Sequence, residues 1–306
     1  MTKTEKKLYQ NIASKLETYD EYELVGIETN ESKNCFIRQV VDSIKRVKYL
    51  QLIAERESTI DVINPINEGF NPMLAATYHR QNGNLDEAFW LVFLATHFGK
   101  DGIFGWGYVR NVYSKLNSGS LWSWTEVCDN VEGFRVWLYE NIEIIRPMGK
   151  FSNHRKFQSL DAFSDKGTGA TVETYVKWIG DEHSHQVFLT KAIDEVGENP
   201  RKLFRHLYNS MTSVVGFGRL GKFDYLTNIG KLGLAPIIPD STYMAGASGP
   251  KRGAILLFGQ NMSNREFDKR FASLESHLEL NFGMQVLEDA VCNWQKDINN
   301  YTHFKG

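Results

Sequence analysis

The sequence predicts an all-α protein, and three observations support this. Apolar residues recur at helical spacing along almost the whole chain, as in Leu8, Ile12 and Leu16, which fall on one face of a helix. No run alternates between apolar and polar residues as a half-buried strand does. The 42% hydrophobic and 13% aromatic content is typical of a globular chain. With 306 residues, the chain can bury a sizeable core, as one large domain or two intimate helical lobes.

The individual helices follow from this spacing and from their start signals. Asn84 and Asn199 stand where N-caps are expected, and Pro200 suits the first turn of the helix after Asn199. We expect helices over residues 72–81, 85–98, 106–116, 131–145, 171–179, 185–196, 200–212, 264–281 and 284–298.

Two segments, residues 57–71 and 146–170, lack regular spacing. We expect residues 1–60 to form an N-terminal helical region and residues 61–306 to form the main domain. The segment 146–170 is the expected divide between two helical lobes.

Composition narrows the class of protein. A formal charge of −2 means that a DNA-binding face would have to be a local cluster of cations on a neutral body. The three cysteines are widely spaced and form no metal-ligand pair, which suits a reducing cytosol. The N-terminus has no signal-peptide core, and the most apolar run, Phe89–Phe98, is too short to span a bilayer. We therefore expect a cytoplasmic protein with no membrane partner.

Two glycine-flanked basic turns, Gly216–Lys222 and Gly246–Arg252, interrupt the helical spacing of residues 212–259. The second has the features of a helix-hairpin-helix, because Gly249 allows a tight turn and Lys251 and Arg252 follow at once. The next helix would begin with unpaired N–H groups, which suit a DNA phosphate. An ordinary turn between helices would show the same pattern.

Four basic clusters stand out on this nearly neutral chain. The first three lie in or beside turns that contain Gly or Asn, where cations can converge on a phosphate. Scattered solvated charge is the alternative interpretation. The clusters are His154-Arg155-Lys156, Arg219 with Lys222, Lys251-Arg252, and Lys269-Arg270.

The last expected helix carries a carboxylate, a thiol and an ammonium on one stripe. Glu288, Cys292 and Lys296 fall at positions i, i+4 and i+8, and so line one helical face. Such a stripe can supply a base, a nucleophile and a phosphate clamp. A Glu–Lys surface pair around a half-buried cysteine would give the same spacing.

Aromatic residues crowd the first half of the chain. Most recur at helical spacing and are expected in the core, while one or two could stack on a nucleotide base. His97 ends an apolar helix, where a C-terminus favours the cationic form. His183 and His185 lack a third ligand nearby and make a poor metal motif. The aromatic residues are Phe104, Trp106, Tyr108, Tyr113, Trp122, Trp124, Phe134 and Trp137.

Six segments carry a family pattern that is specific as a set. They are EAFWLVFLATHFGKDGIFGWGYVRNVY (87–113), FSNHRKFQSL (151–160), GATVETYVKWIG (169–180), GFGRLGKFDYLTNIGKLGL (216–234), SGPKRGAILLFG (248–259) and LEDAVCNWQK (287–296). Together they resemble the alpha-glutamyl/putrescinyl thymine pyrophosphorylases, clade 3, also called amino acid:DNA transferases.

The resemblance implies a fold and a reaction. The family is related to helix-hairpin-helix DNA glycosylases, so residues 61–306 would be a glycosylase-like transferase domain. The activity belongs to bacteriophage thymine hypermodification. A separate kinase converts 5-hydroxymethyluracil in DNA to a pyrophosphate ester, and the transferase displaces pyrophosphate with an amino acid or putrescine. The implied partners are the modified DNA and a small amine, in the host cytoplasm if the protein is phage-encoded.

The implied reaction assigns roles to the residues above. Pyrophosphate leaves with several negative charges, so cations must be fixed around it in advance. Mg²⁺ is an optional helper, with no dedicated metal ligands in the sequence. The expected pyrophosphate-binding residues are His154, Arg155, Lys156, Arg219 and Lys296, and the expected DNA-binding residues are Gly249, Lys251 and Arg252, of which the last two are also candidates for pyrophosphate.

The amine must be neutral to attack, so a carboxylate base is needed. Glu288 is the first choice and Asp224, in the expected wall of the reaction pocket around Gly216–Tyr225, is the second. The target carbon is allylic to the pyrimidine ring. Transient addition of the Cys292 thiolate at ring C6 would ease the departure of pyrophosphate.

Two other functions fit the sequence less fully. A helix-hairpin-helix DNA glycosylase would use an aspartate somewhat under twenty residues beyond its hairpin lysine, and Asp268 stands near that spacing from Lys251. However, Asp268 lies in what reads as an ordinary amphipathic helix. A non-catalytic DNA-binding protein would keep the hairpin and show salt-sensitive binding without turnover.

Overall fold

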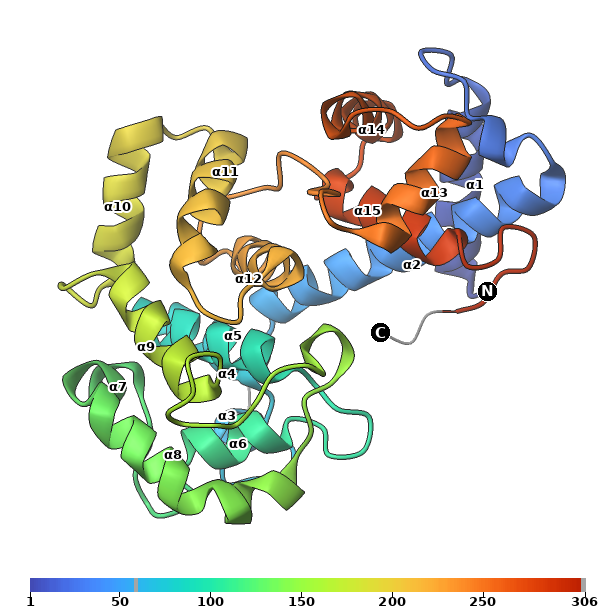
Figure 1. The fold of residues 1–306 in the computed structure, drawn as a ribbon. Coiled ribbons are helices and arrows are strands. Elements are labelled where there is room, and N and C mark those ends of the chain that lie inside the picture. The colour runs from blue at the N-terminus through green and yellow to red at the C-terminus, as the bar shows by residue number, and fades with distance from the viewer. Residues whose placement is uncertain (58–59, 304–306) are drawn as a thin grey trace. The chain divides into compact units, whose positions relative to one another are not determined.

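The computed structural model describes residues 1–57 and 60–303, and they are arranged in helices (Figure 1). Within these residues the secondary structure consists of α-helices, short 3₁₀ turns and one isolated bridge between Asp101 and Gly105. The all-α class predicted from the sequence is confirmed.

The chain divides into two compact units. Unit 1 contains Met1–Leu50 and Pro239–Gly306, so it joins the two ends of the sequence, and unit 2 is the continuous stretch Gln51–Ile238. The predicted boundary after residue 60 lies near the first break, but no sequence pattern indicates the return of the chain to unit 1 at Pro239. The irregular segment 146–170 lies inside unit 2.

Unit 1 packs helices from the start of the chain with helices from its end. Trp294, at the end of the last helix, is fully buried; its ring meets Phe36 edge-on at 5.6 Å and its indole N–H donates to the carbonyl of Ser32. The elements of unit 1 are α1 (Lys3–Glu17), η1 (Val25–Ile27), α2 (Asn30–Glu55, whose last residues belong to unit 2), α13 (Ser248–Phe258), α14 (Asn264–Leu278) and α15 (Gly283–Trp294).

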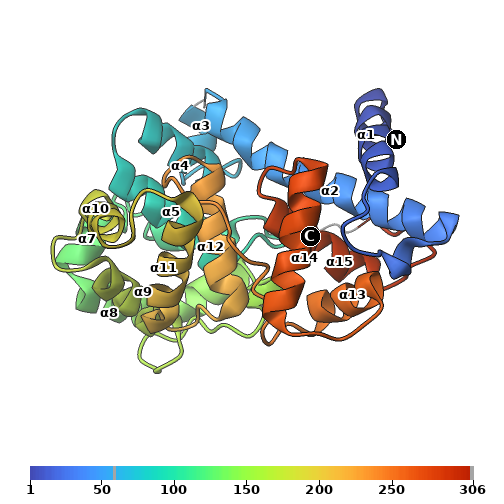
Figure 2. The same cartoon turned by 90° about the horizontal axis from the view of Figure 1, so that it is seen from above.

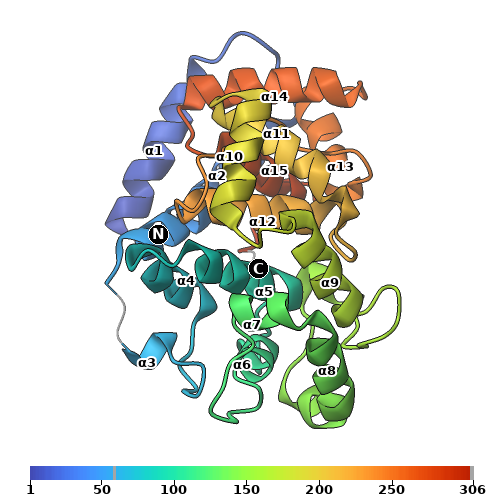
Figure 3. The ribbon, with the colours of Figure 1, turned by 90° about the vertical axis from the view of Figure 1, so that its left-hand side faces the viewer.

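Helices α13 and α15 approach each other closely. Figure 2 shows the two side by side, and Figure 3 shows α14 against the end of α1. A Cβ added to Gly253 would lie 2.2 Å from the carbonyl oxygen of Val291. Only glycine permits this approach of two backbones, so Gly253 sets the distance between the helices that carry the predicted residues of unit 1.

Unit 2 is built around α5 (Leu85–Phe98). Every residue of this helix from Glu87 to Phe98 is buried, as expected for a helix that is apolar on all sides. It packs against α4 and α12. The other helices of unit 2 are α3 (Ile60–Ile63), α4 (Pro72–Gln81), α6 (Gly107–Tyr113), α7 (Trp124–Asp129), α8 (Val131–Ile145), α9 (Thr168–Ile179), α10 (His185–Val196), α11 (Pro200–Ser210) and α12 (Arg219–Lys231).

The predicted helix starts are confirmed where they rest on caps. The Asn84 side chain accepts the backbone N–H of Glu87, and the Asn199 side chain accepts those of Arg201 and Lys202. Each bond satisfies an amide that the helix itself leaves unpaired.

Three predicted helix ends, those of α6, α14 and α15, lie three or more residues too far along the chain. Helix α6 stops at Tyr113 because Lys115, Leu116 and Asn117 all have positive φ angles. Helix α15 stops at Trp294, short of the predicted residue 298.

A chain of hydrogen bonds crosses the core of unit 2 and joins four helices. Asp86 on α5 pairs with Nδ1 of His185 on α10, whose Nε2 meets the hydroxyl of Tyr175 on α9 at 2.8 Å. The Tyr175 hydroxyl pairs in turn with that of Tyr225 on α12 at 2.7 Å. Burial lowers the pKa of His185 and raises the pKa of both tyrosines, so all three side chains are neutral. These hydrogen bonds connect α12 to α5, α9 and α10 and so help to orient it.

Candidate active site

The residues predicted to act on the substrate divide between the two units. Those of unit 2 lie on α12 or within residues 154–156, and those of unit 1 lie on or next to α13 and α15. Unit 2 carries His154, Arg155, Lys156, Arg219 and Asp224; unit 1 carries Gly249, Lys251, Arg252, Glu288, Cys292 and Lys296.

Helix α12 begins without a side-chain cap. Gly216, at φ +76°, turns the chain towards the helix, and the N-cap residue Gly218 has no side chain to offer. The first N–H groups of the helix have no intrahelical partner, and the helix dipole places about half a positive charge there. Such a start favours an anion.

Arg155 brings a buried cation to this helix start. Its side chain lies over the ring of Phe217, and Nη1 donates to the carbonyl of Gly216 at 3.3 Å. A Cβ on Gly221 would lie 2.4 Å from Nη1 and 2.6 Å from Nη2, so the guanidinium rests directly on the first turn of α12. Nη2 is buried and has no hydrogen-bond partner among the described residues.

An unsatisfied buried donor is rare and costly in a folded protein, which makes this position notable. Burial lowers the pKa of Arg155, while the negative charge of Asp224 opposes that shift. Arginine stays protonated in proteins nonetheless. Unit 2 therefore gathers Arg155, Asp224 and the first residue of α12, Arg219, at one helix start, which can hold an anion.

The three consecutive cations predicted to meet a phosphate differ in burial. Arg155 is only 5% exposed, whereas His154 and Lys156 on either side of it are exposed. Residues 153–155 form a 3₁₀ turn, in which consecutive side chains point in different directions. The roles of His154 and Lys156 at a pyrophosphate site stay predictions.

Lys222, which the sequence groups with Arg219, is held by neighbouring side chains. Its Nζ donates to the Thr212 hydroxyl at 2.8 Å and lies 4.2 Å from the ring centre of Tyr208. Burial lowers the pKa of this ammonium.

The expectation of a cationic His97 is wrong. The side chain is fully buried and its Nε2 pairs with the Thr168 hydroxyl at 2.9 Å. Burial, with a smaller contribution from the nearby charge of Arg155, lowers the pKa of His97 to about 3. The cost of burying the charge exceeds the favourable effect of the helix C-terminus, because desolvation can shift a pKa by several units.

This burial predicts a pH dependence of stability. Between pH 3 and 6.5 the unfolded state binds a proton at His97 and the folded state does not. The unfolding free energy therefore falls as the pH drops through this window. The loss should be on the order of 3–5 kcal/mol at its largest. Denaturant unfolding of the wild type and of His97→Gln measures it: the wild type should lose more stability than the variant between pH 7 and 4, and equal slopes would contradict the prediction.

In unit 1, α15 presents Glu288 and Cys292 one turn apart. Glu288 is buried and Cys292 is half-buried. A Cβ on Gly249 would lie 3.1 Å from Sγ of Cys292, so the thiol packs on the first turn of α13. A helix start favours negative charge, and a thiolate is therefore well placed here. The sequence pattern predicted that Glu288 and Cys292 share one helical face. The structure also shows that Gly249 lies against the Cys292 thiol.

Lys296 does not continue the predicted stripe. Helix α15 ends at Trp294, and Lys296 lies in the turn beyond, where its Nζ donates to the Asn293 side chain at 2.8 Å. The expectation that it lines the same helical face as Glu288 and Cys292 is wrong, because two residues past the helix end the i+8 relationship no longer holds.

The second basic turn is part of a helix. Lys251 and Arg252 lie within α13, and the segment before this helix, residues 232–247, contains no helix. Gly246, at φ +75°, makes the turn into α13. A helix-hairpin-helix relationship, and DNA binding by Lys251 and Arg252, stay predictions.

Asp268, the aspartate that a glycosylase would need, holds a loop in place. Its carboxylate accepts the Ser241 hydroxyl at 2.7 Å, the Thr242 hydroxyl at 2.7 Å and the Thr242 backbone N–H at 3.0 Å. A carboxylate with three such donors is satisfied, and its structural role is sufficient to explain it.

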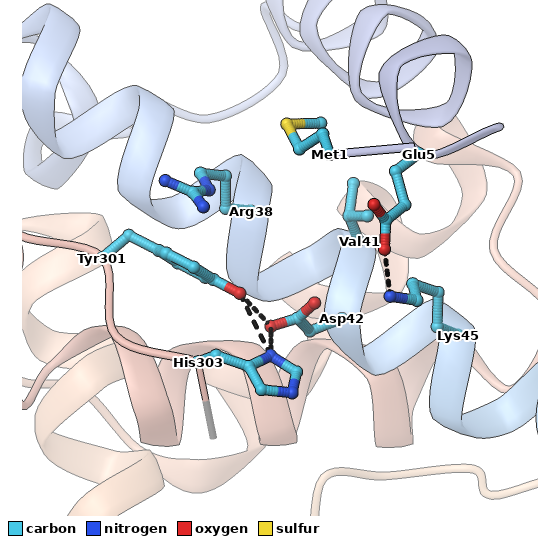
Figure 4. Close-up of a pocket in the computed structure, with 8 residues that line it drawn as sticks. All are labelled: Met1, Glu5, Arg38, Val41, Asp42, Lys45, Tyr301 and His303. Carbon is cyan, nitrogen blue, oxygen red and sulfur yellow. Dashed lines mark hydrogen bonds and ion pairs between the residues drawn. The ribbon is translucent and has the colours of Figure 1, made fainter. Parts of the chain in front are cut away.

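Unit 1 also has a pocket of about 280 Å³ between α1, α2 and the end of the chain (Figure 4). Its charges are largely paired within its own wall. Lys45 pairs with Glu5, and Asp42 accepts the Tyr301 hydroxyl and pairs with His303 at 2.8 Å. It is therefore less suited to a highly charged anion than the start of α12. The lining residues are Met1, Glu5, Arg38, Val41, Asp42, Lys45, Tyr301 and His303.

The described residues contain no group of three or more His, Cys, Asp or Glu side chains that could hold a metal ion. Every helix among residues 1–57 and 60–303 is too short or too polar to cross a membrane.

Comparison with known proteins identifies a family. A family model described as alpha-glutamyl/putrescinyl thymine pyrophosphorylase clade 3 matches residues 31–306. This range contains every residue predicted above to take part in binding or catalysis. No curated protein and no solved structure matches the chain.

Proposed function

We propose that this chain, which belongs to the alpha-glutamyl/putrescinyl thymine pyrophosphorylase clade 3 family, transfers an amine to a modified base of DNA with release of pyrophosphate. The family description names an enzyme of thymine modification. The substrate that we propose is a 5-pyrophosphoryloxymethyluracil base in DNA. The second substrate is a small amine, either an amino acid or putrescine.

The observation that carries this proposal is the unsatisfied Nη2 of the Arg155 guanidinium at the start of α12. Arg155 Nη2 is a buried donor without a partner among the described residues, and it lies against a helix start that has no side-chain cap. Oxygens of a pyrophosphate would satisfy the donor and the helix N–H groups together. Arg219, the first residue of the helix, would add a second cation. Fixed cations of this kind stabilise charge that develops on a leaving group.

For unit 1 we propose the covalent part of the reaction. The Cys292 thiolate adds to ring C6, and the displaced electron pair moves to the C4 carbonyl oxygen. Return of that pair expels pyrophosphate and leaves an exocyclic methylene at C5. The amine then attacks the methylene while Glu288 takes its proton, and loss of the thiolate from C6 restores the ring. Asp224 on α12 remains the second choice for the base.

The experiment that tests the function is mass spectrometry of nucleosides from treated DNA. DNA containing 5-pyrophosphoryloxymethyluracil is incubated with the protein and a panel of amines, and pyrophosphate is measured in parallel. We expect an aminomethyl-linked nucleoside and stoichiometric pyrophosphate only when DNA and amine are both present. Absence of a mass shift with every amine, on a substrate whose pyrophosphorylation has been verified, would overturn the proposal.

A change at Asp268 separates the transferase from a glycosylase. Because Asp268 holds Ser241 and Thr242, Asp268→Ala should lower the unfolding free energy by about 1–3 kcal/mol. Transfer measured per folded molecule should stay near the wild-type rate. Asp268→Asn keeps the shape of the side chain and serves as the better-folded comparison. If both variants are folded and inactive, and the wild type produces abasic sites, the glycosylase interpretation is correct instead.

A further inference from the structure

Unit 2 carries an apolar side chain at the tip of a tightly bonded turn. Asp101 and Gly105 exchange backbone hydrogen bonds of 2.8 and 3.0 Å, and the Asp101 carboxylate accepts the N–H groups of Ile103 and Phe104 at 2.8 and 3.0 Å. These four bonds hold residues 101–105, called here the 101–105 turn, in one conformation. Four of the five backbone N–H groups in the turn are thus satisfied within the turn itself.

The tip of this turn faces solvent. Ile103 is 89% exposed and Phe104 is 44% exposed. A single exposed apolar residue is ordinary on a protein surface. Here two neighbours are held outwards by a rigid turn, which is the form of a wedge rather than of a flexible loop.

The base of the turn is anchored in an aromatic cluster. Phe98, just before the turn, and Tyr108, just after it, both contact Phe151, with ring centres 5.6 and 5.2 Å apart. The hydroxyl of Ser152 donates to the carbonyl of Lys100 at 2.6 Å. The residues on both sides of the 101–105 turn are therefore packed and hydrogen-bonded against the start of segment 151–157.

The surroundings of the tip are rich in cations. Lys100 and Lys150 are exposed beside the turn, and Lys156 is exposed on segment 151–157. The Asp101 carboxylate points back into its own turn; backbone N–H groups, and to a smaller extent the charge of Lys150, lower its pKa. A pocket of about 200 Å³ next to Phe104 is lined by the cations Lys100 and Arg110 and by one acidic residue, Glu68.

A second exposed aromatic residue lies on segment 151–157. Phe157 is 86% exposed, and the ammonium of Lys156 lies 5.0 Å from its ring centre. Two residues earlier in the segment, Arg155 reaches the start of α12. Phe157 therefore lies two residues along the chain from Arg155 of the proposed pyrophosphate site.

We propose that Ile103 and Phe104 form a wedge that enters the base stack of duplex DNA and holds the target nucleotide out of the helix. Apolar side chains set among cations suit this role, because the cations bind phosphates while the apolar groups replace a base in the stack. An enzyme that acts on a base gains access to it in this way. The inference rests on the proposed function, since it takes modified DNA as the partner.

The test compares duplex with single-stranded DNA. The double variant Ile103→Ala/Phe104→Ala should lower the transfer rate on duplex by about tenfold or more, and leave the rate on single-stranded DNA unchanged. The control is Leu52→Ala, which removes a side chain of unit 2 that is also largely exposed (64%). In parallel, a 2-aminopurine placed next to the target base in duplex should brighten on binding of the wild type and not of the double variant.

The outcomes separate the wedge from the function. Equal losses on duplex and single strands, or a fluorescence rise that persists in the double variant, would overturn the wedge. A fluorescence rise with no transfer by the wild type on any DNA would overturn the proposed reaction but keep the wedge. Binding to anionic phospholipid vesicles that is lost in the double variant, with DNA behaviour unchanged, would assign the tip to a membrane surface and also overturn the wedge.

Discussion

Replacement of Arg155 with methionine is expected to slow pyrophosphate release in a single turnover by about 10²–10³-fold. The guanidinium is buried against the first turn of α12, and its Nη2 has no partner among the described residues. In the proposed reaction this donor gains its partner as charge develops on the leaving pyrophosphate. An interaction that strengthens in the transition state contributes to the rate and not only to binding. Rapid-quench measurement of pyrophosphate at saturating amine reports this step.

The control for Arg155 is a cation of unit 2 with no proposed role. Lys166→Met removes an exposed cation and should change the rate by less than about threefold because solvent screens it. Arg155→Met also removes a hydrogen bond to the carbonyl of Gly216, so the unfolding free energy of each variant is needed. A rate per folded molecule equal to that of the wild type would make Arg155 a purely structural residue.

The sequence predicted those parts of the fold that depend on local interactions. Helix starts at Asn84 and Asn199 follow from side chains that cap the next turn, and such signals act within four residues. The pairing of Glu288 with Cys292 likewise follows from the helical repeat alone. Nothing in these inferences required knowledge of distant contacts.

The features that escaped sequence analysis depend on distant contacts. The burial that keeps His97 neutral comes from residues far along the chain, including Thr168. Arg155 differs from Lys156 only because Phe217 and Gly221 receive its guanidinium. The exposure of Ile103 had no signal in the apolar pattern, since an isoleucine at a turn looks like any core residue until the turn is placed.

The second large effect is expected at Glu288. Glu288→Gln should lower the rate of amine transfer by about 10²–10⁴-fold near neutral pH, because the amide cannot take the proton of the attacking amine. The substitution keeps the size of a side chain that is only 4% exposed, so the packing of α15 should survive. Asp289→Asn is the matched control on the same helix, since the Asp289 carboxylate pairs with Ser43 and Arg46 and has no role in the reaction.

The pH profile distinguishes a base from a structural residue at position 288. A solution amine becomes neutral without help as the pH rises, by about tenfold per unit below its own pKa. The deficit of Glu288→Gln should therefore shrink with rising pH, while Asp289→Asn should follow the wild type throughout. A deficit that stays constant across the range would mean that Glu288 supports the structure of α15 and that another group accepts the proton. Asp224 is the residue to change next in that case, because it is the remaining carboxylate predicted to act as base and it lies on α12 beside the charge of Arg155.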